Sequence, residues 1–271
     1  MSPTRVLVVY GSETGNVRRG VHACVAEWQG QPQHGTAYSI TSADVVSGND
    51  AADEFKSLAE LVQNFDVLIV ATSSFGEGDP PANFLRFLLM LVKGASAESK
   101  PTRLPPLAGL QHAVVGYGQS VYPTFMSCPR YTDKLLETLG SRRMVQRVEI
   151  DEGPTETVAA GTDEVSSWTA MSSGPGEAAT ETMGRAVPLQ AFSKAVHAAL
   201  LTAAATTDEP AVCPWSVPGD ALVEKSAEEL LTVRPETLDD PGLPQWVKYA
   251  AVALLAAVVT HNTPQYLSMS M

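Results

Sequence analysis

The turn GSETGN, residues 11–16, carries side chains and backbone groups that could bind phosphate. It offers two hydroxyls, one amide side chain and several backbone N–H groups just before an expected helix. The first N–H groups of a helix lack intrahelical acceptors and lie at its positive end. The turn has neither the lysine of a P-loop nor GxGxxG spacing, so it favours a single phosphate monoester bound by neutral donors. An ordinary N-capped turn between a strand and a helix is the alternative.

Two aromatic residues lie in glycine-rich loops that could bind a flat ring. Phe75 precedes Gly76 and Gly78 in TSSFGEGD, and Tyr122 follows the paired glycines of VVGYGQSVY. Two aromatic rings can sandwich a planar ligand by offset stacking, and glycine lets the backbone approach the ligand's edge. Core packing is the alternative for each aromatic. Binding sites collect on loops of rigid scaffolds, so we expect these two rings to contact a ligand.

The elements that must position these loops follow from hydrophobic periodicity. Short apolar runs predict buried strands at 5–10, 66–72, 112–118 and 143–151. Helical spacing and terminal Pro or Gly residues predict helices at about 15–28, 52–65, 81–93, 128–140 and 188–205. Residues 36–46 fit either a short strand or a turn, and residues 94–109 look like a loop. This alternation predicts an α/β domain with a five-stranded parallel sheet between two helical layers.

The polar loops follow the first, third and fourth expected strands, and Asp151 ends the fifth. Because sheets of this kind bind ligands at the carboxyl ends of their strands, these residues should meet at one edge.

The net charge narrows the class of partner, and the cysteine content narrows the cellular compartment. The 271-residue chain has a formal net charge of −12, which argues against nucleic acid and anionic membranes. It permits docking onto basic proteins, although acidity for solubility alone is an equal alternative. The three cysteines form no CxxC pair, which indicates neither a disulfide framework nor a zinc site. A reducing, cytoplasmic location fits best, and the short apolar run near the N-terminus does not fit a signal peptide.

No catalytic arrangement of side chains stands out. The five histidines show neither HxxxH nor HExxH spacing, so no metal site is predicted. His22 and His197 lie in expected helices, where packing or surface exposure is the default. Any chemistry must then come from a bound cofactor.

The chain changes character after residue 151. Residues 152–187 are rich in Gly, Thr, Ser, Ala and Glu, and we expect a mobile insertion within a domain spanning 1–205. Residues 206–271 are expected to be a linker and C-terminal extension of unknown role. The apolar stretch 246–260 is too short for a membrane span, which favours a packed helix.

Three segments carry a resemblance to a known family. YGSETGN (10–16), TSSFGEGDPPANF (72–84) and VVGYGQSVYPTFMSCPRYTDKLLETLG (114–140) resemble the FMN-binding, flavodoxin-like domain of the diflavin reductases. The resemblance is to the cytochrome P450 reductase and nitric-oxide synthase reductase type. It covers about 4–151 together with the helix near 188–205. It implies a flavodoxin-like three-layer sandwich with sheet order 2-1-3-4-5, and FMN as the cofactor.

The resemblance also implies a role for each matching residue. The FMN phosphate would be held by Ser12, Glu13, Thr14, Gly15 and Asn16, and Val17 would also contact the cofactor. The isoalloxazine would lie between Phe75 and Tyr122, and the carbonyl of Gly76 would accept a hydrogen bond from N5 of the reduced flavin. The remaining flavin contacts would come from Ser73, Ser74, Glu77, Gly78, Gly116, Tyr117, Gly118, Gln119, Phe125 and Asp151. Gln119 and Ile150 depart from the family, which usually has asparagine and glycine there.

The implied function is an electron-transfer flavoprotein domain. Such a domain takes electrons from an FAD- and NADPH-dependent reductase and passes them to a haem or iron–sulfur acceptor. Two alternatives stay open: an FMN-dependent NAD(P)H or quinone oxidoreductase, and a non-redox flavodoxin-like binding module. No nicotinamide-binding motif is visible in the sequence.

Overall fold

The structure is a computed structural model that describes residues 2–97, 104–152, 179–202 and 223–232. Its strands are β1 Thr4–Tyr10, β2 Tyr38–Ser39, β3 Val45–Ser47, β4 Val67–Ser73, β5 Gln111–Gly118, β6 Arg142–Arg143 and β7 Val148–Asp151. Its helices are α1 Asn16–Gln29, α2 Gly48–Glu54, α3 Leu58–Asn64, α4 Leu85–Ala97, α5 Ser127–Thr138, α7 Ala179–Thr202 and α8 Ala227–Thr232. Two short 3-10 turns cover Ser42–Asp44 and Ala82–Phe84.

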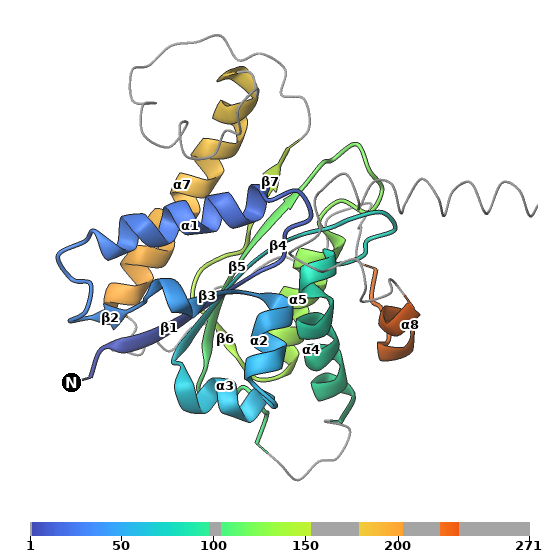
Figure 1. Ribbon diagram of the computed structural model, residues 1–271, viewed down its shortest axis with the longest axis horizontal. Helices are drawn as coiled ribbons and strands as arrows, with labels where there is room; N and C mark the ends of the chain where they lie inside the picture. The colour runs from blue at the N-terminus through green and yellow to red at the C-terminus, as the bar shows by residue number, and fades with distance from the viewer. Residues whose placement is uncertain (1, 98–103, 153–178, 203–222, 233–271) are drawn as a thin grey trace, which may run out of the picture. The chain divides into compact units, whose positions relative to one another are not determined.

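All strands pair in parallel within one sheet. The order is β2-β1-β4-β5-β6, with β3 beside β1 and β7 beside β5. The pieces β2 and β3 together form one edge of the sheet, and β6 and β7 form the other (Figure 1). Counted this way, the sheet has five positions in the order 2-1-3-4-5, which confirms the expected topology.

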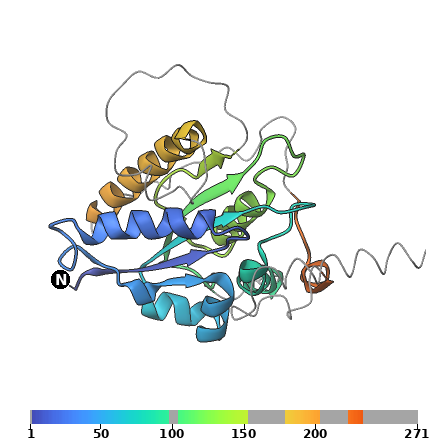
Figure 2. The same cartoon turned by 45° about the horizontal axis from the view of Figure 1, so that its top comes forward.

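Helices cover both faces of the sheet because its central strands are apolar on both sides. In β1, Val6 and Val8 point into one core cluster, whereas Leu7 and Val9 point into the other. The first cluster lies beneath α1 and α7, and the second lies beneath α2, α3, α4 and α5. Figure 2 shows the two layers on opposite sides of the sheet.

Two expected elements are interrupted. The helix predicted over 52–65 is instead α2 and α3, because Phe55 adopts an extended conformation and buries its ring against Phe65, with centroids 5.7 Å apart. The strand predicted over 143–151 is split into β6 and β7. Between them the side chain of Arg147 turns inward to Asp133, with Nη1 2.6 Å from Oδ2.

The helix predicted to begin at residue 188 begins at Ala179. Residues 179–187, which the sequence placed in an irregular insertion, are therefore helical, and 153–178 lie outside the described residues. The helix predicted over 81–93 also runs further, to Ala97, after a 3-10 turn at its start.

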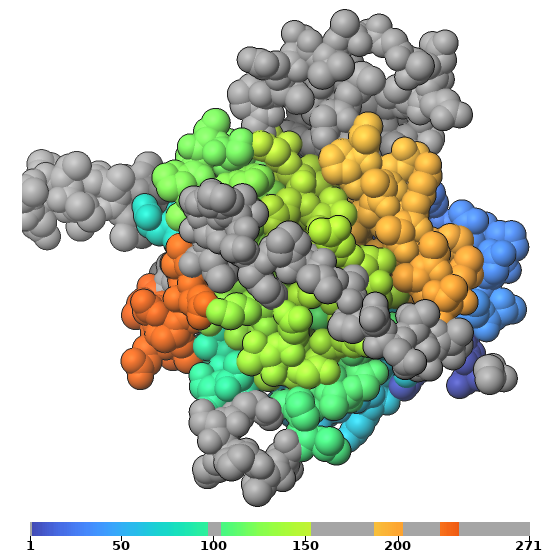
Figure 3. All heavy atoms as spheres, turned by 180° about the vertical axis from the view of Figure 1, so that it is seen from behind, coloured from blue at the N-terminus to red at the C-terminus, as the bar shows by residue number. Residues whose placement is uncertain are grey.

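Residues 223–232, which include α8, pack against α4 and α5. Leu230 is fully buried in the core cluster on that side, and the Tyr131 hydroxyl donates to the Lys225 carbonyl over 3.1 Å. Figure 3 shows this segment in orange against the green surfaces of α4 and α5. The division of the chain at residue 205 stays a prediction, and the stretch 246–260 lies outside the described residues.

No helix in the described ranges combines the length and apolar character that crossing a bilayer requires.

Candidate functional site

The carboxyl ends of four strands meet at one edge of the sheet. The register pairs Tyr10 with Ala71 between β1 and β4, and Ser73 with Tyr117 between β4 and β5. Gly118, the last residue of β5, pairs with Asp151, the last residue of β7. The segments that contain the predicted site residues, 12–17, 73–78, 116–125 and 151, therefore all begin or end at this edge.

The turn after β1 is fixed by the segment that precedes α4. The Ser12 amide donates to Oδ1 of Asn83 over 2.9 Å, and Oε2 of Glu13 accepts from the Ala82 amide over 3.1 Å. Gly11 leaves space for the buried ring of Phe84, because a Cβ on this glycine would lie 2.5 Å from the Phe84 Cβ. Asn83 thus positions the turn, a role that no local sequence pattern indicates.

Within the same turn, the Ser12 hydroxyl oxygen accepts from the Gly15 amide over 3.0 Å. Gly15 has φ +87° and directly precedes α1, so the chain enters the helix through a left-handed residue that glycine tolerates. The first N–H groups of α1 are thereby presented at the sheet edge, where an anion can accept them.

The two predicted aromatic residues are exposed on neighbouring loops. Phe75 is 47% exposed and Tyr122 is 59% exposed, values that contrast with the fully buried rings of Phe84 and Phe87. Neither ring belongs to a core cluster. Core packing, the alternative for both residues, therefore does not explain them, and both rings remain accessible to a planar ligand.

The loop after β4 is a tight turn. Phe75 and Asp79 exchange two backbone hydrogen bonds, of 2.9 and 2.7 Å, and the enclosed Gly76 and Gly78 have φ values of +49° and +82°. The Gly76 carbonyl accepts a hydrogen bond from the Thr124 hydroxyl over 2.8 Å. This bond links the loops that carry the two aromatic rings.

The same loop is contacted by the first residue of α5 and by the segment 223–225. A Cβ on Gly78 would lie 2.9 Å from Ser127 Oγ, and that oxygen accepts the Val223 amide over 2.7 Å. Lys225 forms an ion pair with Asp79. Ser74, a predicted flavin contact, has its hydroxyl oxygen engaged by the Cys128 amide over 2.8 Å.

Several predicted site residues serve core packing and do not present a side chain at the site. The Tyr117 ring is buried under α1, where a Cβ on Gly20 would lie 2.3 Å from its hydroxyl. Val17 is likewise buried in that core cluster. The missing side chain of Gly116 makes room for Met126 and Pro129, because a Cβ there would lie 2.7 Å from each. Gly116 thus serves internal packing.

The end of β7 is tied to the loop after β5. Oδ1 of Asp151 accepts from the Ser120 amide over 3.0 Å, and the Glu152 amide donates to the Gly118 carbonyl over 2.6 Å. Glu152 also accepts from Nδ2 of Asn16 over 3.0 Å, which joins the phosphate-type turn to the end of the last strand. Asp151 is exposed at this rim.

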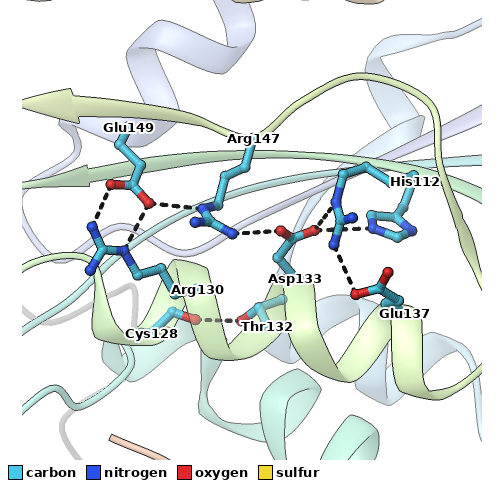
Figure 4. Close-up of polar contacts among 9 residues, drawn as sticks. His112, Cys128, Arg130, Thr132, Asp133, Glu137, Arg147 and Glu149 are labelled. Carbon is cyan, nitrogen blue, oxygen red and sulfur yellow. Dashed lines mark hydrogen bonds and ion pairs between the residues drawn. The ribbon is translucent and has the colours of Figure 1, made fainter. Parts of the chain in front are cut away.

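A buried charged network supports the same strand from below (Figure 4). Asp133, on α5, accepts from Arg143 at 3.0 Å and Arg147 at 2.6 Å. Glu149, on β7, pairs with Arg147 at 2.9 Å and with Arg130 at 2.7 Å. This chain of charges clamps β7 to α5, so that the position of Asp151 depends on it.

The network sets the protonation of its members. Burial alone would raise the pKa of the Asp133 carboxyl, but hydrogen bonds from His112 and Arg143 outweigh it and lower that pKa. Burial lowers the pKa of His112, more than its hydrogen bond to Asp133 raises it. A neutral His112 can donate from Nε2 to Oδ1 of Asp133, 3.1 Å away.

The site residues fit a phosphorylated flavin. Phe75 and Tyr122 offer exposed rings to a planar ligand, and the turn at 11–16 presents the N-terminus of α1 to an anion such as phosphate. A doubly wound sheet with these loops at its carboxyl edge defines a flavodoxin-like protein.

Comparisons with known proteins identify the family. The family model described as Flavodoxin matches residues 8–162, and this chain belongs to that family. FMN is the cofactor that the family binds.

Individual relatives carry longer chains. The sulfite reductase [NADPH] flavoprotein alpha-component of Neisseria meningitidis serogroup B is 31% identical over 163 residues, which cover 60% of this chain and 23% of that protein. The Bacillus subtilis protein of the same name is 30% identical over 146 residues, covering 54% of this chain and 20% of that protein. This chain therefore aligns with less than a quarter of the length of these relatives.

Among solved structures, oxidised Flavodoxin 1 from Bacillus cereus aligns with a TM-score of 0.45 at 16% identity, covering 71% of this chain and 97% of that one.

Proposed function

We propose that the chain is an FMN module that relays electrons from an NADPH- and FAD-dependent reductase to a haem or iron–sulfur protein. The diflavin-reductase type that its motifs resemble is part of this proposal. The observation that carries it is the exposure of Phe75 and Tyr122 at the carboxyl edge of the sheet. A flavin held between them lies at the protein surface, where electrons can pass to a docked partner. When bound, FMN supplies the redox chemistry, and the protein residues bind and orient it.

Charge at the rim of the site supports docking onto a basic partner. Glu13, Glu77 and Asp151 are exposed on the loops that surround the two aromatic rings. The net charge of −12 gives the whole chain the same sign. Complementary charge increases the rate at which such partners meet, and salt screens this attraction.

The test is electron transfer to a basic acceptor. The FMN-loaded protein is reduced and mixed with cytochrome c at increasing ionic strength, and the second-order rate constant should fall several-fold. The variant E77Q should weaken this salt dependence, whereas E54Q, on the exposed surface of α2, should leave it unchanged. A rate that is flat from low to high salt would refute electrostatic docking. Oxidation of NADPH by the isolated protein would instead favour the oxidoreductase alternative.

The cytoplasmic location belongs to the same proposal, as does a C-terminal extension after residue 205, of which residues 223–232 pack against the domain. The described cysteines Cys24 and Cys128 are free thiols in the core, which agrees with a reducing compartment. Burial raises the pKa of each thiol to about 12, so neither is a reactive thiolate.

A further inference from the structure

Arg19 lies one turn into α1 and reaches back to the phosphate-type turn. Helical side chains tilt toward the N-terminus, so a long side chain at this position covers the start of its own helix. Its Nη2 donates to Oδ1 of Asn16 over 2.5 Å, and its Nη1 would lie 3.7 Å from a Cβ on Gly15. The guanidinium is therefore held beside the left-handed residue through which the chain enters the helix.

One donor of this guanidinium has no acceptor among the described residues. Nε of Arg19 is buried and makes no hydrogen bond there. Buried donors are almost always paired in folded proteins, and an unpaired one needs an explanation such as an absent ligand or ion. An arginine donor beside a helix N-terminus suits an oxyanion, because guanidinium N–H groups match phosphate oxygens.

Two carboxylates lie near the turn, so a cation there would offset their repulsion of a phosphate. Glu13 lies within the turn, and Glu152 contacts Asn16. A phosphate monoester carries between one and two negative charges at neutral pH, so neutral donors alone would hold it beside two carboxylates. Burial, and then the charge of Arg18, lower the pKa of His22, so this nearby side chain adds no charge at neutral pH.

We propose that Arg19 donates a charge-assisted hydrogen bond to the phosphate of FMN, which makes the phosphate site cationic. This inference rests on the proposed function. It adds a ligand to the neutral donors expected from the sequence, and it makes binding selective for phosphorylated over unphosphorylated flavin. Asn16 positions the guanidinium and is itself held by Glu152.

The test compares FMN with riboflavin, which has the same ring and no phosphate. Dissociation constants are measured by flavin fluorescence for the wild type, R19Q and R18Q, and circular dichroism confirms folding. Arg18 is an exposed neighbour on the same helix, so R18Q is the matched control for loss of one positive charge. We expect R19Q to weaken FMN binding by about 10- to 100-fold, in line with a hydrogen bond to a charged group. Riboflavin binding should change less than about twofold, and R19K should restore part of the FMN affinity.

Three outcomes would overturn the inference, and they are distinguishable. If R19Q binds FMN within about twofold of the wild type, this inference is refuted and the proposed function is unaffected. Equal weakening for FMN and riboflavin would show that Arg19 shapes the whole site. Failure of the wild-type protein to bind either flavin would overturn the proposed function and this inference together.

Discussion

The hydroxyl of Thr124 donates a hydrogen bond to the carbonyl oxygen of Gly76 over 2.8 Å. This carbonyl is the group expected to accept a hydrogen bond from N5 of the reduced flavin. Thr124 thus shares the acceptor that a bound cofactor would need, and it belongs to the loop that also carries Tyr122. Through this bond, the loop that carries Tyr122 can affect the hydrogen bond between the Gly76 carbonyl and the flavin, and thereby the reduction potential of the flavin.

Replacing Thr124 with valine should therefore raise the potential at which bound FMN accepts its first electron. A neutral hydrogen bond contributes about 0.5–1.5 kcal/mol, which corresponds to roughly 20–65 mV for one electron. The measurement is a redox titration of the FMN-loaded protein followed by visible absorbance. T124S retains the hydroxyl and should match the wild type. An unchanged or lower potential in T124V would show that Thr124 does not compete for this carbonyl.

Removing either exposed ring should weaken FMN binding without destabilising the fold. F75A and Y122A each lose one stacking partner, worth about 0.5–1.5 kcal/mol, so each dissociation constant should rise by roughly 2- to 10-fold. The midpoint of urea unfolding without FMN should stay close to wild type, because both side chains are exposed. V121A alters an exposed apolar neighbour of Tyr122 and should change neither quantity. Wild-type affinity in both aromatic variants would place the flavin elsewhere.

How much of this site follows from sequence depends on the kind of contact. Phe75, Tyr122 and the turn at 11–16 lie beside glycines at strand ends, so local pattern and topology place them. Asn83 could not be found that way, because its bond to Ser12 joins residues 71 apart in the chain. No sequence motif marks Arg19, because the phosphate contact proposed for it depends on the direction in which a helical side chain points.

In the fold, too, the sequence predicted what local patterns determine and missed what contacts between distant residues determine. Apolar runs such as 66–72 predicted the buried strands correctly, since a strand covered on both faces needs apolar side chains throughout. The split between β6 and β7 was missed because Arg143 and Arg147 turn inward to Asp133 on a separate helix. The sequence pattern of 143–151 gave no sign of these contacts.

Asp133→Asn should destabilise the protein strongly. The change removes the carboxylate shared by Arg143 and Arg147, and breaking a buried ion pair in this way costs about 3–5 kcal/mol. D53N breaks the exposed pair with Arg86 and should cost about 1 kcal/mol or less. Chemical unfolding at pH 7 measures both. Equal effects from the two variants would show that the network in Figure 4 does not clamp β7 to α5.

Acid should reduce the free energy of unfolding, and His112 should be one cause. Its pKa is lower in the folded protein than in the unfolded chain, so below about pH 6.5 the unfolded chain binds more protons. The free energy of unfolding therefore decreases as pH falls, by at most about 1.4 kcal/mol per pH unit for one histidine. Asp133 and Glu149 also have lowered pKa values, so their contribution is lost only in more acidic solution.

The variant H112Q separates this contribution from the others. Its free energy of unfolding should depend less steeply on pH between 7 and 5 than that of wild type. H22Q is the control, because the pKa of His22 is also lowered and its loss should leave the contribution of His112 in place. A wild-type slope in H112Q would assign the acid sensitivity to other groups.

The segment 223–232 should contribute to the stability of the domain it packs against. Leu230 is fully buried and Leu231 is 63% exposed, so the two adjacent leucines form a matched pair. L230A should lower the free energy of unfolding by about 2–4 kcal/mol, and L231A should change it by about 0.5 kcal/mol or less. Urea unfolding measures both. If neither variant changes the midpoint, α8 does not belong to the folding unit of the domain.

FMN binding is best tested by the visible absorption spectrum of the purified protein, before and after addition of FMN. We predict flavin bands that co-purify, or a saturable spectral change as FMN is added, with stepwise reduction afterwards. Absence of flavin bands together with no spectral change on titration would refute FMN binding, and the non-redox binding module would then become the leading interpretation.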